Sequence, residues 1–118
     1  MGYDICLHDP VTKELIQFDA KHHIHGGNME LEGTTEAWLH ITYNYSKYFE
    51  QVLGKGGIRG IYGKTGSETI PCLKQAIAAL GDDVSEDYWA ATEGNAKKAL
   101  VGLLAFAQMR PDGVWDGD

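Results

Sequence analysis

The chain has 118 residues, 43% of them hydrophobic, and its 17 acidic and 10 basic residues give a formal charge of −7 at pH 7. This length predicts a single domain over residues 1–118, with about two-thirds of the unfolded surface buried on folding. No apolar run reaches the roughly 20 residues of a membrane span, and the N-terminus lacks a signal-peptide pattern. The negative charge disfavours direct binding to nucleic-acid phosphates. We therefore expect a cytoplasmic protein without direct contact to membranes or nucleic acids.

The two cysteines, Cys6 and Cys72, do not predict a disulfide framework, because thiols stay reduced in the cytoplasm. The acidic surplus has two interpretations. It can serve solubility alone, or it can complement a basic partner surface such as the nucleic-acid channel of a nuclease.

The first thirty residues predict a short series of strands. Residues 3–8 alternate in polarity, with Ile5 and Leu7 on one face, as a half-buried strand does. Asp9-Pro10 begins a turn, and residues 15–18 would return as the second strand of a hairpin. Residues 20–29, with three histidines followed by Gly26-Gly27, predict a third strand running into a loop.

The stretch 36–49 is the expected centre of the core. Apolar and aromatic residues alternate with polar ones from residue 37 to 45, which favours a strand to about Tyr43. A helix capped by Asn44 or Ser46 should follow and run to Leu53, with Gly54 as its stop. A three/four spacing of apolar residues leaves a helix open as the alternative for residues 36–45.

The second half of the chain predicts helices. Six glycines mark residues 54–66 as a loop, after which Ser67 would cap a helix with Pro71 in its first turn and Gly81 at its end. Residues 82–89 form an acidic connector. Thr92 or Asn95 would open a last helix to about residue 109, followed by a short acidic tail.

This order of strands followed by helices predicts an α+β fold. We expect an N-terminal antiparallel sheet of three or four strands, packed by about three C-terminal α-helices.

The strongest chemical candidate is a metal site near the N-terminus. Residues two apart on a strand share a face, so a thiol and imidazoles from the first and third strands would converge if those strands are neighbours. Zinc prefers such ligands, and a structural zinc ion contributes folding energy to a small domain. The expected ligands are Cys6, His8, His23 and His25, with His22 as a substitute. The alternative is a buried cysteine beside a solvated histidine turn, since the spacing matches no standard zinc finger.

Other catalytic or ligand-binding signals are weaker. The Gly63-Lys64-Thr65 triplet resembles the end of a phosphate loop, but Ile58 stands where that motif needs glycine. An anion could still be held at the start of the following helix. No serine or cysteine lies in a recognisable nucleophile motif, and His40 is more typical of a satisfied core-edge histidine than of an acid–base catalyst. We therefore expect a protein that is not an enzyme.

A second candidate is an acidic surface with aromatic anchors, which suits a basic protein partner. The alternative is that the tryptophans cover helix ends, and Trp115 in particular either packs onto the domain or waits for a partner. The expected partner-binding residues are Tyr88, Trp89, Trp115, Asp87 and Asp116.

Several segments resemble a family of small phage and prophage proteins: residues 38–45, 57–59, 61–63, 88–89, 92–96 and 110–115. The resemblance covers most of the chain, but the family is mostly uncharacterised and supplies no catalytic residues. Small acidic proteins of this type include anti-CRISPR proteins, which bind and block a host Cas nuclease.

The resemblance implies an inhibitor of a Cas9-like bacterial defence nuclease that blocks nucleic-acid loading and carries a structural zinc. Its acidic groups would engage basic residues that normally hold nucleic acid. The alternatives are a small metal-dependent hydrolase with an open coordination position and a structural phage protein that forms a symmetric oligomer.

Overall fold

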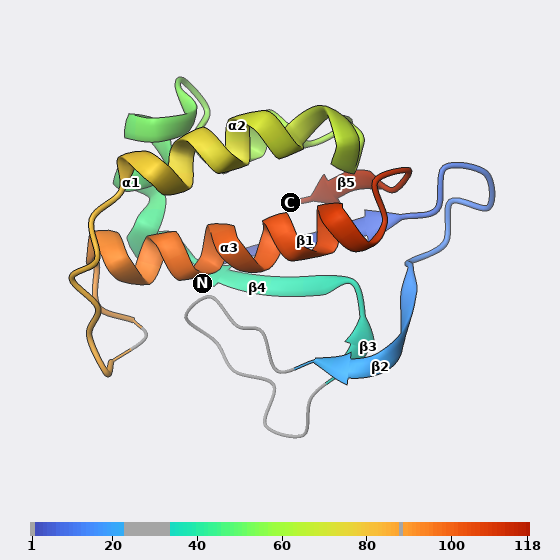
Figure 1. Cartoon of the computed structure of the whole chain (residues 1–118), viewed down its shortest axis with the longest axis horizontal. Coiled ribbons are helices and arrows are strands. Elements are labelled where there is room, and N and C mark those ends of the chain that lie inside the picture. Colours follow the sequence, from blue (N-terminus) through green and yellow to red (C-terminus); the bar gives the residue numbers. More distant parts are fainter. Residues whose placement is uncertain (1, 23–33, 88) are drawn as a thin grey trace.

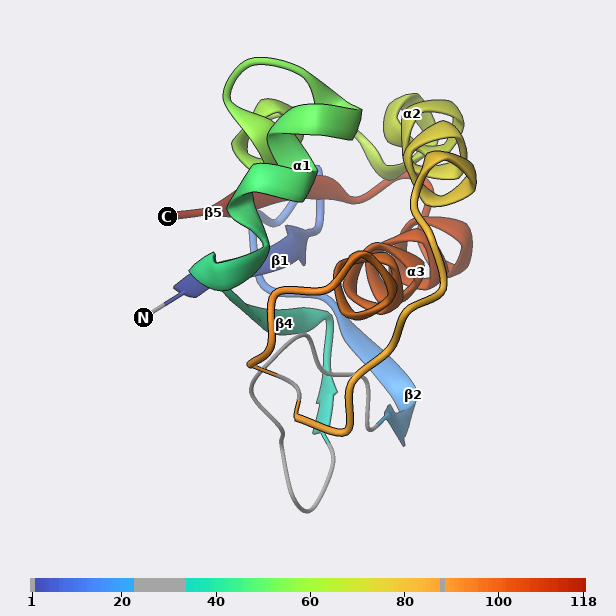
Figure 2. The same ribbon diagram turned by 90° about the vertical axis from the view of Figure 1, so that its left-hand side faces the viewer.

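The computed structural model describes residues 2–22, 34–87 and 89–118 and has the α+β architecture that the sequence predicts. An antiparallel sheet contains β1 (Gly2–His8), β4 (Trp38–Thr42) and β5 (Val114–Gly117) in the order β4-β1-β5. The helices α1 (Ser46–Leu53), α2 (Gly66–Ala79) and α3 (Glu93–Met109) lie on one side of this sheet (Figures 1 and 2). Two further strands, β2 (Gln17–His22) and β3 (Thr34–Glu36), pair separately.

The central strand β1 divides its side chains between two faces. Ile5 and Leu7 are fully buried toward the helices, whereas Asp4, Cys6 and His8 are only partly buried on the opposite face. This is the period-2 alternation that the sequence predicts for residues 3–8. Both edges of β1 are occupied, by β4 on one side and β5 on the other.

The predicted N-terminal hairpin is only partly present. Leu15 forms a single bridge to His8, and the N–H of Ile16 donates to Leu7 at 3.0 Å. The chain then leaves the sheet, and β2 pairs with β3 instead of β1. The prediction of a second strand beside the first was therefore wrong beyond this bridge, because β4 and β5 already satisfy both edges of β1. Of the predicted third strand, residues 20–22 belong to β2, and residues 23–29 lie outside the described part of the chain.

The central stretch has the predicted order of strand and helix. After β4, a 3-10 turn (Tyr43–Tyr45) leads into α1. The helix ends at Gly54, which takes a φ of 88° that favours glycine. The predicted caps were wrong, because Thr42 accepts a hydrogen bond from the N–H of Asn44 and no side chain caps α1 itself.

The start of α2 also differs from its prediction. Thr65 caps the helix and exchanges hydrogen bonds with Glu68 in a capping box, so the helix begins before Ser67. Pro71 consequently lies inside the helix and not in its first turn. The helix α3 matches its prediction, with Thr92 as its cap. Among the described residues no helix is long and apolar enough to cross a membrane.

The acidic tail forms the edge strand β5, which the sequence did not predict. Trp115 is 1% exposed and contributes its indole to the core. Its Nε1 donates a hydrogen bond of 2.7 Å to the hydroxyl of Thr69 on α2, so the buried polar group is satisfied. Of the two alternatives for this tryptophan, the structure has the one in which it packs onto the domain.

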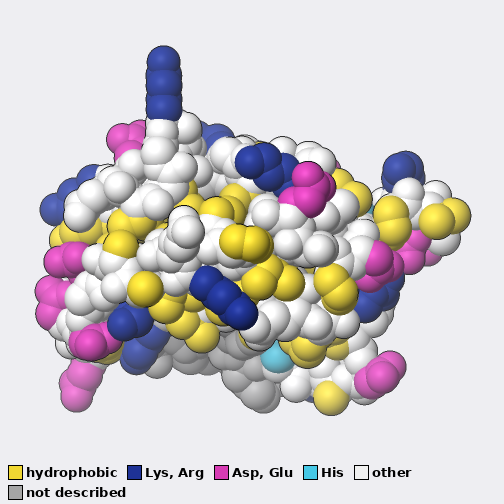
Figure 3. All heavy atoms as spheres, turned by 45° about the horizontal axis from the view of Figure 1, so that its top comes forward, with side chains coloured by type: hydrophobic (Ala, Val, Ile, Leu, Met, Phe, Trp, Pro, Cys, Tyr) yellow, Lys and Arg dark blue, Asp and Glu magenta, His cyan; other side chains and the backbone are white. Residues whose placement is uncertain are grey.

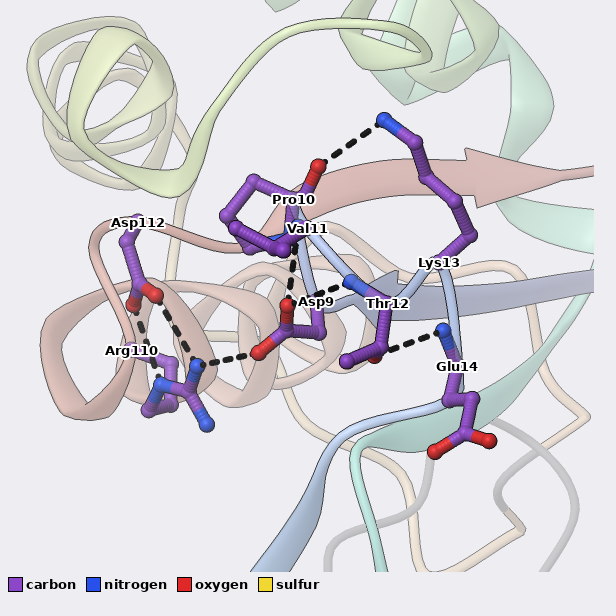
Figure 4. A network of polar contacts seen from close by, with 8 residues as sticks. All are labelled: Asp9, Pro10, Val11, Thr12, Lys13, Glu14, Arg110 and Asp112. Carbon is purple, nitrogen blue, oxygen red and sulfur yellow. Dashed lines mark hydrogen bonds and ion pairs between the residues drawn. The ribbon is translucent and has the colours of Figure 1, made fainter.

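The turn after β1 is tied to the end of α3 by a polar network (Figure 4). Oδ1 of Asp9 accepts hydrogen bonds from the N–H groups of Val11 and Thr12 at 2.8 and 3.0 Å. Arg110, just after α3, contacts Asp9 at 3.3 Å and Asp112 at 2.9 Å. These hydrogen bonds, those from Thr12 and Val11 foremost, lower the pKa of the Asp9 carboxyl.

Candidate functional site

One candidate site is the face of the three-stranded sheet that the helices do not cover, here called the outer sheet face. It carries a continuous row of titratable side chains from all three strands, because paired positions on neighbouring strands project to the same side. His40 of β4 is paired with Asp4 of β1, and Asp116 of β5 with Cys6. The outer sheet face is defined by Asp4, Cys6, His8, His40 and Asp116.

Cys6, His8 and Asp116 form a connected group on this face. The thiol sulfur of Cys6 lies 3.4 Å from Nε2 of His8. The other ring nitrogen, Nδ1, lies 3.6 Å from Oδ2 of Asp116. The order thiol, imidazole, carboxylate is that of an activated nucleophile, and it is also that of a metal-binding pair with an outer carboxylate.

The environment of Cys6 favours the protonated thiol. Burial raises its pKa to about 11, with further contributions from the negative charges of Asp116 and Asp4. A reactive cysteine needs the opposite environment, with a depressed pKa and positive surroundings. The group therefore does not have the electrostatics of a resting cysteine nucleophile.

The structure brings together only part of the predicted metal set. Nε2 of His22 lies 2.7 Å from the carbonyl oxygen of Glu36, and its ring packs edge-on against Phe106. His23 and His25 lie outside the described residues. Within residues 2–22, 34–87 and 89–118, no three histidine, cysteine or acidic side chains converge as metal ligands. Cys6 and His8 are thus the part of the predicted set that is seen in contact.

Asp4 and His40 make a second pair on the same face. Oδ1 of Asp4 lies 2.7 Å from Nδ1 of His40. Nε2 of His40 is buried and has no hydrogen-bond partner within the described part of the chain. Gly2 makes room for the ring, since a Cβ there would come within 2.6 Å of Nε2. The burial of Nε2 leaves no access for a substrate, so this pair has the character of a structural contact.

The other candidate site is the connector between α2 and α3, here called the acidic loop and defined as residues 82–87 and 89–92. Its main chain is held by side chains from other elements. Asn44 donates to the carbonyl of Trp89 at 2.7 Å, and the hydroxyl of Tyr48 donates to that of Ala91 at 3.0 Å. The loop is therefore braced against the 3-10 turn and α1.

Asn95 of α3 is the hub of the acidic loop. It is nearly fully buried, and its amide nitrogen donates to the carbonyls of Asp87 and Ala90, each at 3.0 Å. Its amide oxygen accepts from the N–H of Ser85 at 3.1 Å. Gly94 lets the loop approach α3 closely, because a Cβ there would lie 2.8 Å from the backbone of Val84. These contacts give the loop a defined shape before any partner binds.

The side chains of the acidic loop are exposed while its backbone is held. Trp89 is 44% exposed, and four acidic residues of the loop are exposed as well: Asp82, Asp83, Glu86 and Asp87. Asp82 pairs with Lys97 at 2.6 Å, and Asp83 and Asp87 accept hydrogen bonds from the N–H groups of Gly94 and Trp89. Figure 3 shows acidic side chains gathered at the left edge of the molecule, the end at which this connector runs in Figure 1. The loop thus exposes a large aromatic side chain together with several carboxylates, and its binding to a basic partner stays a prediction.

The predicted partner-binding residues divide between different places. Asp87 and Trp89 lie in the acidic loop, and Tyr88 lies outside the described residues. Trp115 is in the core, so its prediction as a surface anchor is corrected. Asp116 is exposed on β5, where it contacts His8 and belongs to the outer sheet face.

The start of α2 is not a free anion site. The N–H groups of Gly66 and Ser67 donate to the carbonyls of Gly113 and Pro111, and that of Glu68 donates to the Thr65 hydroxyl. The backbone groups that would hold a phosphate at a helix N-terminus are thus already bonded.

The residues that sequence reasoning missed are those that position the acidic loop: Asn44, Tyr48 and Asn95. The sequence predicts Asn95 only as a possible helix cap. A buried asparagine in the first turn of a helix, next to a connector without regular structure, indicates such a hub, since a buried amide must find several partners.

Comparisons with protein-family models, with curated proteins and with solved structures found no match to this chain.

Proposed function

We propose that this protein is a non-enzymatic inhibitor that binds a basic, nucleic-acid-binding surface of a bacterial defence nuclease of the Cas9 type. Bound there, it would exclude guide or target nucleic acid. The observation that carries the proposal is the acidic loop, in which exposed carboxylates and a half-exposed Trp89 share one braced main chain.

Bracing of the loop supports affinity. A loop that is already ordered loses less conformational entropy on binding than a flexible loop does. The hydrogen bonds from Asn44, Tyr48 and Asn95 fix the main chain at four carbonyls. The aromatic side chain can then serve as the apolar anchor, with the carboxylates as its polar rim.

Charge supports the choice of partner. The net charge of −7 speeds association with a positively charged channel and repels nucleic acid itself. A Cas9-type nuclease holds its heteroduplex in such a channel through backbone contacts that do not depend on sequence. Carboxylates would compete for the same lysines and arginines, so the mechanism is occlusion.

The test is binding to Cas9-type nucleases, without and with guide RNA and target DNA, together with DNA cleavage at saturating inhibitor. We expect binding to weaken with rising salt, to compete with nucleic acid and to suppress cleavage. Unchanged DNA loading and cleavage across several orthologues would overturn the proposal.

Two variants locate the contact on the acidic loop. Trp89→Ala should weaken binding at least about tenfold, as hot-spot aromatic residues do. Glu86→Lys should weaken binding as well, because it reverses a charge that faces the basic partner. The substitution should leave the fold intact, since the Glu86 side chain is exposed and no hydrogen bond is seen for it among the described residues. Glu14→Lys is the matched control, because it makes the same charge change in the turn at the other end of the molecule (Figure 1). Equal losses for the two lysine variants would mean that net charge acts without a specific loop contact.

A further inference from the structure

We propose that Cys6 and His8 bind a zinc ion as a chelating pair, through Sγ and Nε2, and that Asp116 orients the imidazole. This site lies on the outer sheet face, and its existence does not depend on the inhibitor function. The sequence predicts a larger set of ligands, and the proposed site uses two ligand atoms of that set and one supporting carboxylate.

The distance between the two ligand atoms suits zinc. Bond lengths of about 2.3 Å to sulfur and 2.05 Å to nitrogen, at a tetrahedral angle, place sulfur and nitrogen about 3.6 Å apart. The observed separation of Sγ and Nε2 is 3.4 Å. Both side chains project from the same face of β1, so the two atoms can share an ion without a change in the strand.

A carboxylate lies close to the other nitrogen of the imidazole. Nε2 lies 3.4 Å from the thiol sulfur, while Nδ1 lies 3.6 Å from Oδ2 of Asp116, slightly longer than a hydrogen bond. A histidine that binds metal usually donates its other N–H to a carboxylate, which sets the tautomer and strengthens the ligand. The pairing of β1 with β5 provides this carboxylate, because Asp116 is the direct neighbour of Cys6 in the sheet.

Binding is a simple exchange of a proton for a metal ion. The thiol releases its proton to solvent, and the thiolate and the Nε2 lone pair each donate two electrons to zinc. Without metal, the same atoms make a thiol–imidazole hydrogen bond. This hydrogen bond alone would also explain the short distance between Sγ and Nε2. It is therefore the alternative against which zinc binding is tested.

The experiment uses the full chain, stripped with a chelator and titrated with Zn²⁺ under native mass spectrometry and calorimetry, and with Co²⁺ under absorption spectroscopy. We expect stoichiometric zinc binding and a thiolate-to-cobalt charge-transfer band in the near ultraviolet. Cys6→Ser and His8→Ala should each weaken zinc binding more than about tenfold. Asp116→Asn should weaken it about 10- to 100-fold, as loss of an outer carboxylate does, while the cobalt band persists.

Cys72→Ser is the matched control. Cys72 is the chain's other cysteine, and its thiol lies 3.1 Å from the carbonyl of Thr69. This variant should bind zinc as the unaltered chain does. Absence of the cobalt band, or zinc binding that is equally tight in Cys6→Ser and His8→Ala, would overturn the proposal.

A measurement on the unaltered chain guards against variants that fail to fold. Zinc should slow alkylation of Cys6 at least about tenfold, read by peptide mass spectrometry, and leave the alkylation of Cys72 unchanged. Equal rates of Cys6 alkylation with and without zinc would overturn the proposal and favour the thiol–imidazole hydrogen bond alone.

Discussion

At the scale of single residues, buried polar side chains carry the specificity of this fold. Three polar residues are almost fully buried in the described part of the chain: Thr42, Thr69 and Asn95. Each one is hydrogen-bonded, and each connects segments that are separate in the fold or caps a turn. Burial without such partners would cost free energy, so these residues specify which segments meet.

The hydrogen bond between Thr69 and Trp115 can be tested by a pair of similar substitutions. Thr69→Val keeps the shape but removes the acceptor for the indole N–H, and we expect a loss of about 1–3 kcal/mol in the free energy of unfolding. Thr69→Ser keeps the hydroxyl and should cost less. Urea unfolding measures both, and a negligible loss in Thr69→Val would mean that this hydrogen bond does not stabilise the fold.

At the scale of elements, the turn between β1 and β2 is fastened to the end of α3 by charge. Asp9 bonds its own turn and also Arg110, which in turn binds Asp112 (Figure 4). Hydrogen bonds to backbone N–H groups and to the guanidinium lower the pKa of Asp9, and those to Arg110 lower the pKa of Asp112. The free energy of unfolding should therefore decrease at acidic pH.

The direction of this pH dependence follows from linkage. Both carboxyls have a lower pKa in the folded chain than in the unfolded chain, so the unfolded chain binds more protons as the pH falls. Their stabilisation is fully present above the unfolded pKa of about 3.9 and is lost as the pH drops through the folded values. Asp9→Asn should be less stable than the unaltered chain at pH 7, and the two should converge near pH 2 in urea unfolding. A difference that is constant with pH would contradict this.

The acidic loop is also positioned by contacts from other elements. Its main chain is held by side chains of the 3-10 turn, α1 and α3, while the side chains of Glu86 and Trp89 are exposed to solvent. The outer sheet face is likewise assembled from three strands that are far apart in the sequence. Each candidate site thus depends on contacts between elements.

At the scale of the whole molecule, the two described ends of the chain lie close together and are joined by a hydrogen bond. The N–H of Asp4 in β1 donates to the side chain of Asp118 at 2.9 Å, and both labelled ends lie on the same side in Figure 2. Between them, β5 places Trp115 against the helices. The C-terminal strand therefore supplies a core residue, Trp115, while Asp116 and Asp118 stay exposed.

The two tryptophans at positions 89 and 115 should separate stability from binding. Trp115→Ala removes a fully buried indole and should cost about 3–5 kcal/mol, a large share of the total stability of a domain of this size. Trp89→Ala removes a half-exposed one and should change the free energy of unfolding by only about 0.5 kcal/mol. Thermal and urea unfolding measure both, and a comparable loss in Trp89→Ala would contradict the assignment of Trp89 to a binding surface.

What the sequence determined by itself is local. Alternation in residues 3–8 and 37–45 predicted β1 and β4, and Gly54 and Thr92 marked helix ends that the structure confirms. The proximity of Cys6 to His8 also follows from their spacing on one strand. These features depend on the chain's own periodicity and capping chemistry, which act over a few residues.

What only the tertiary structure decided is which segments pair. A period-2 pattern says that a strand has two faces, but it does not name the strand beside it. Thus β5 and not β2 lies along β1, Trp115 is in the core and not on the surface, and Asp116 joins Cys6 and His8. Such pairings are chosen by the total burial of apolar area, a quantity that belongs to the whole chain and that no local stretch of sequence contains.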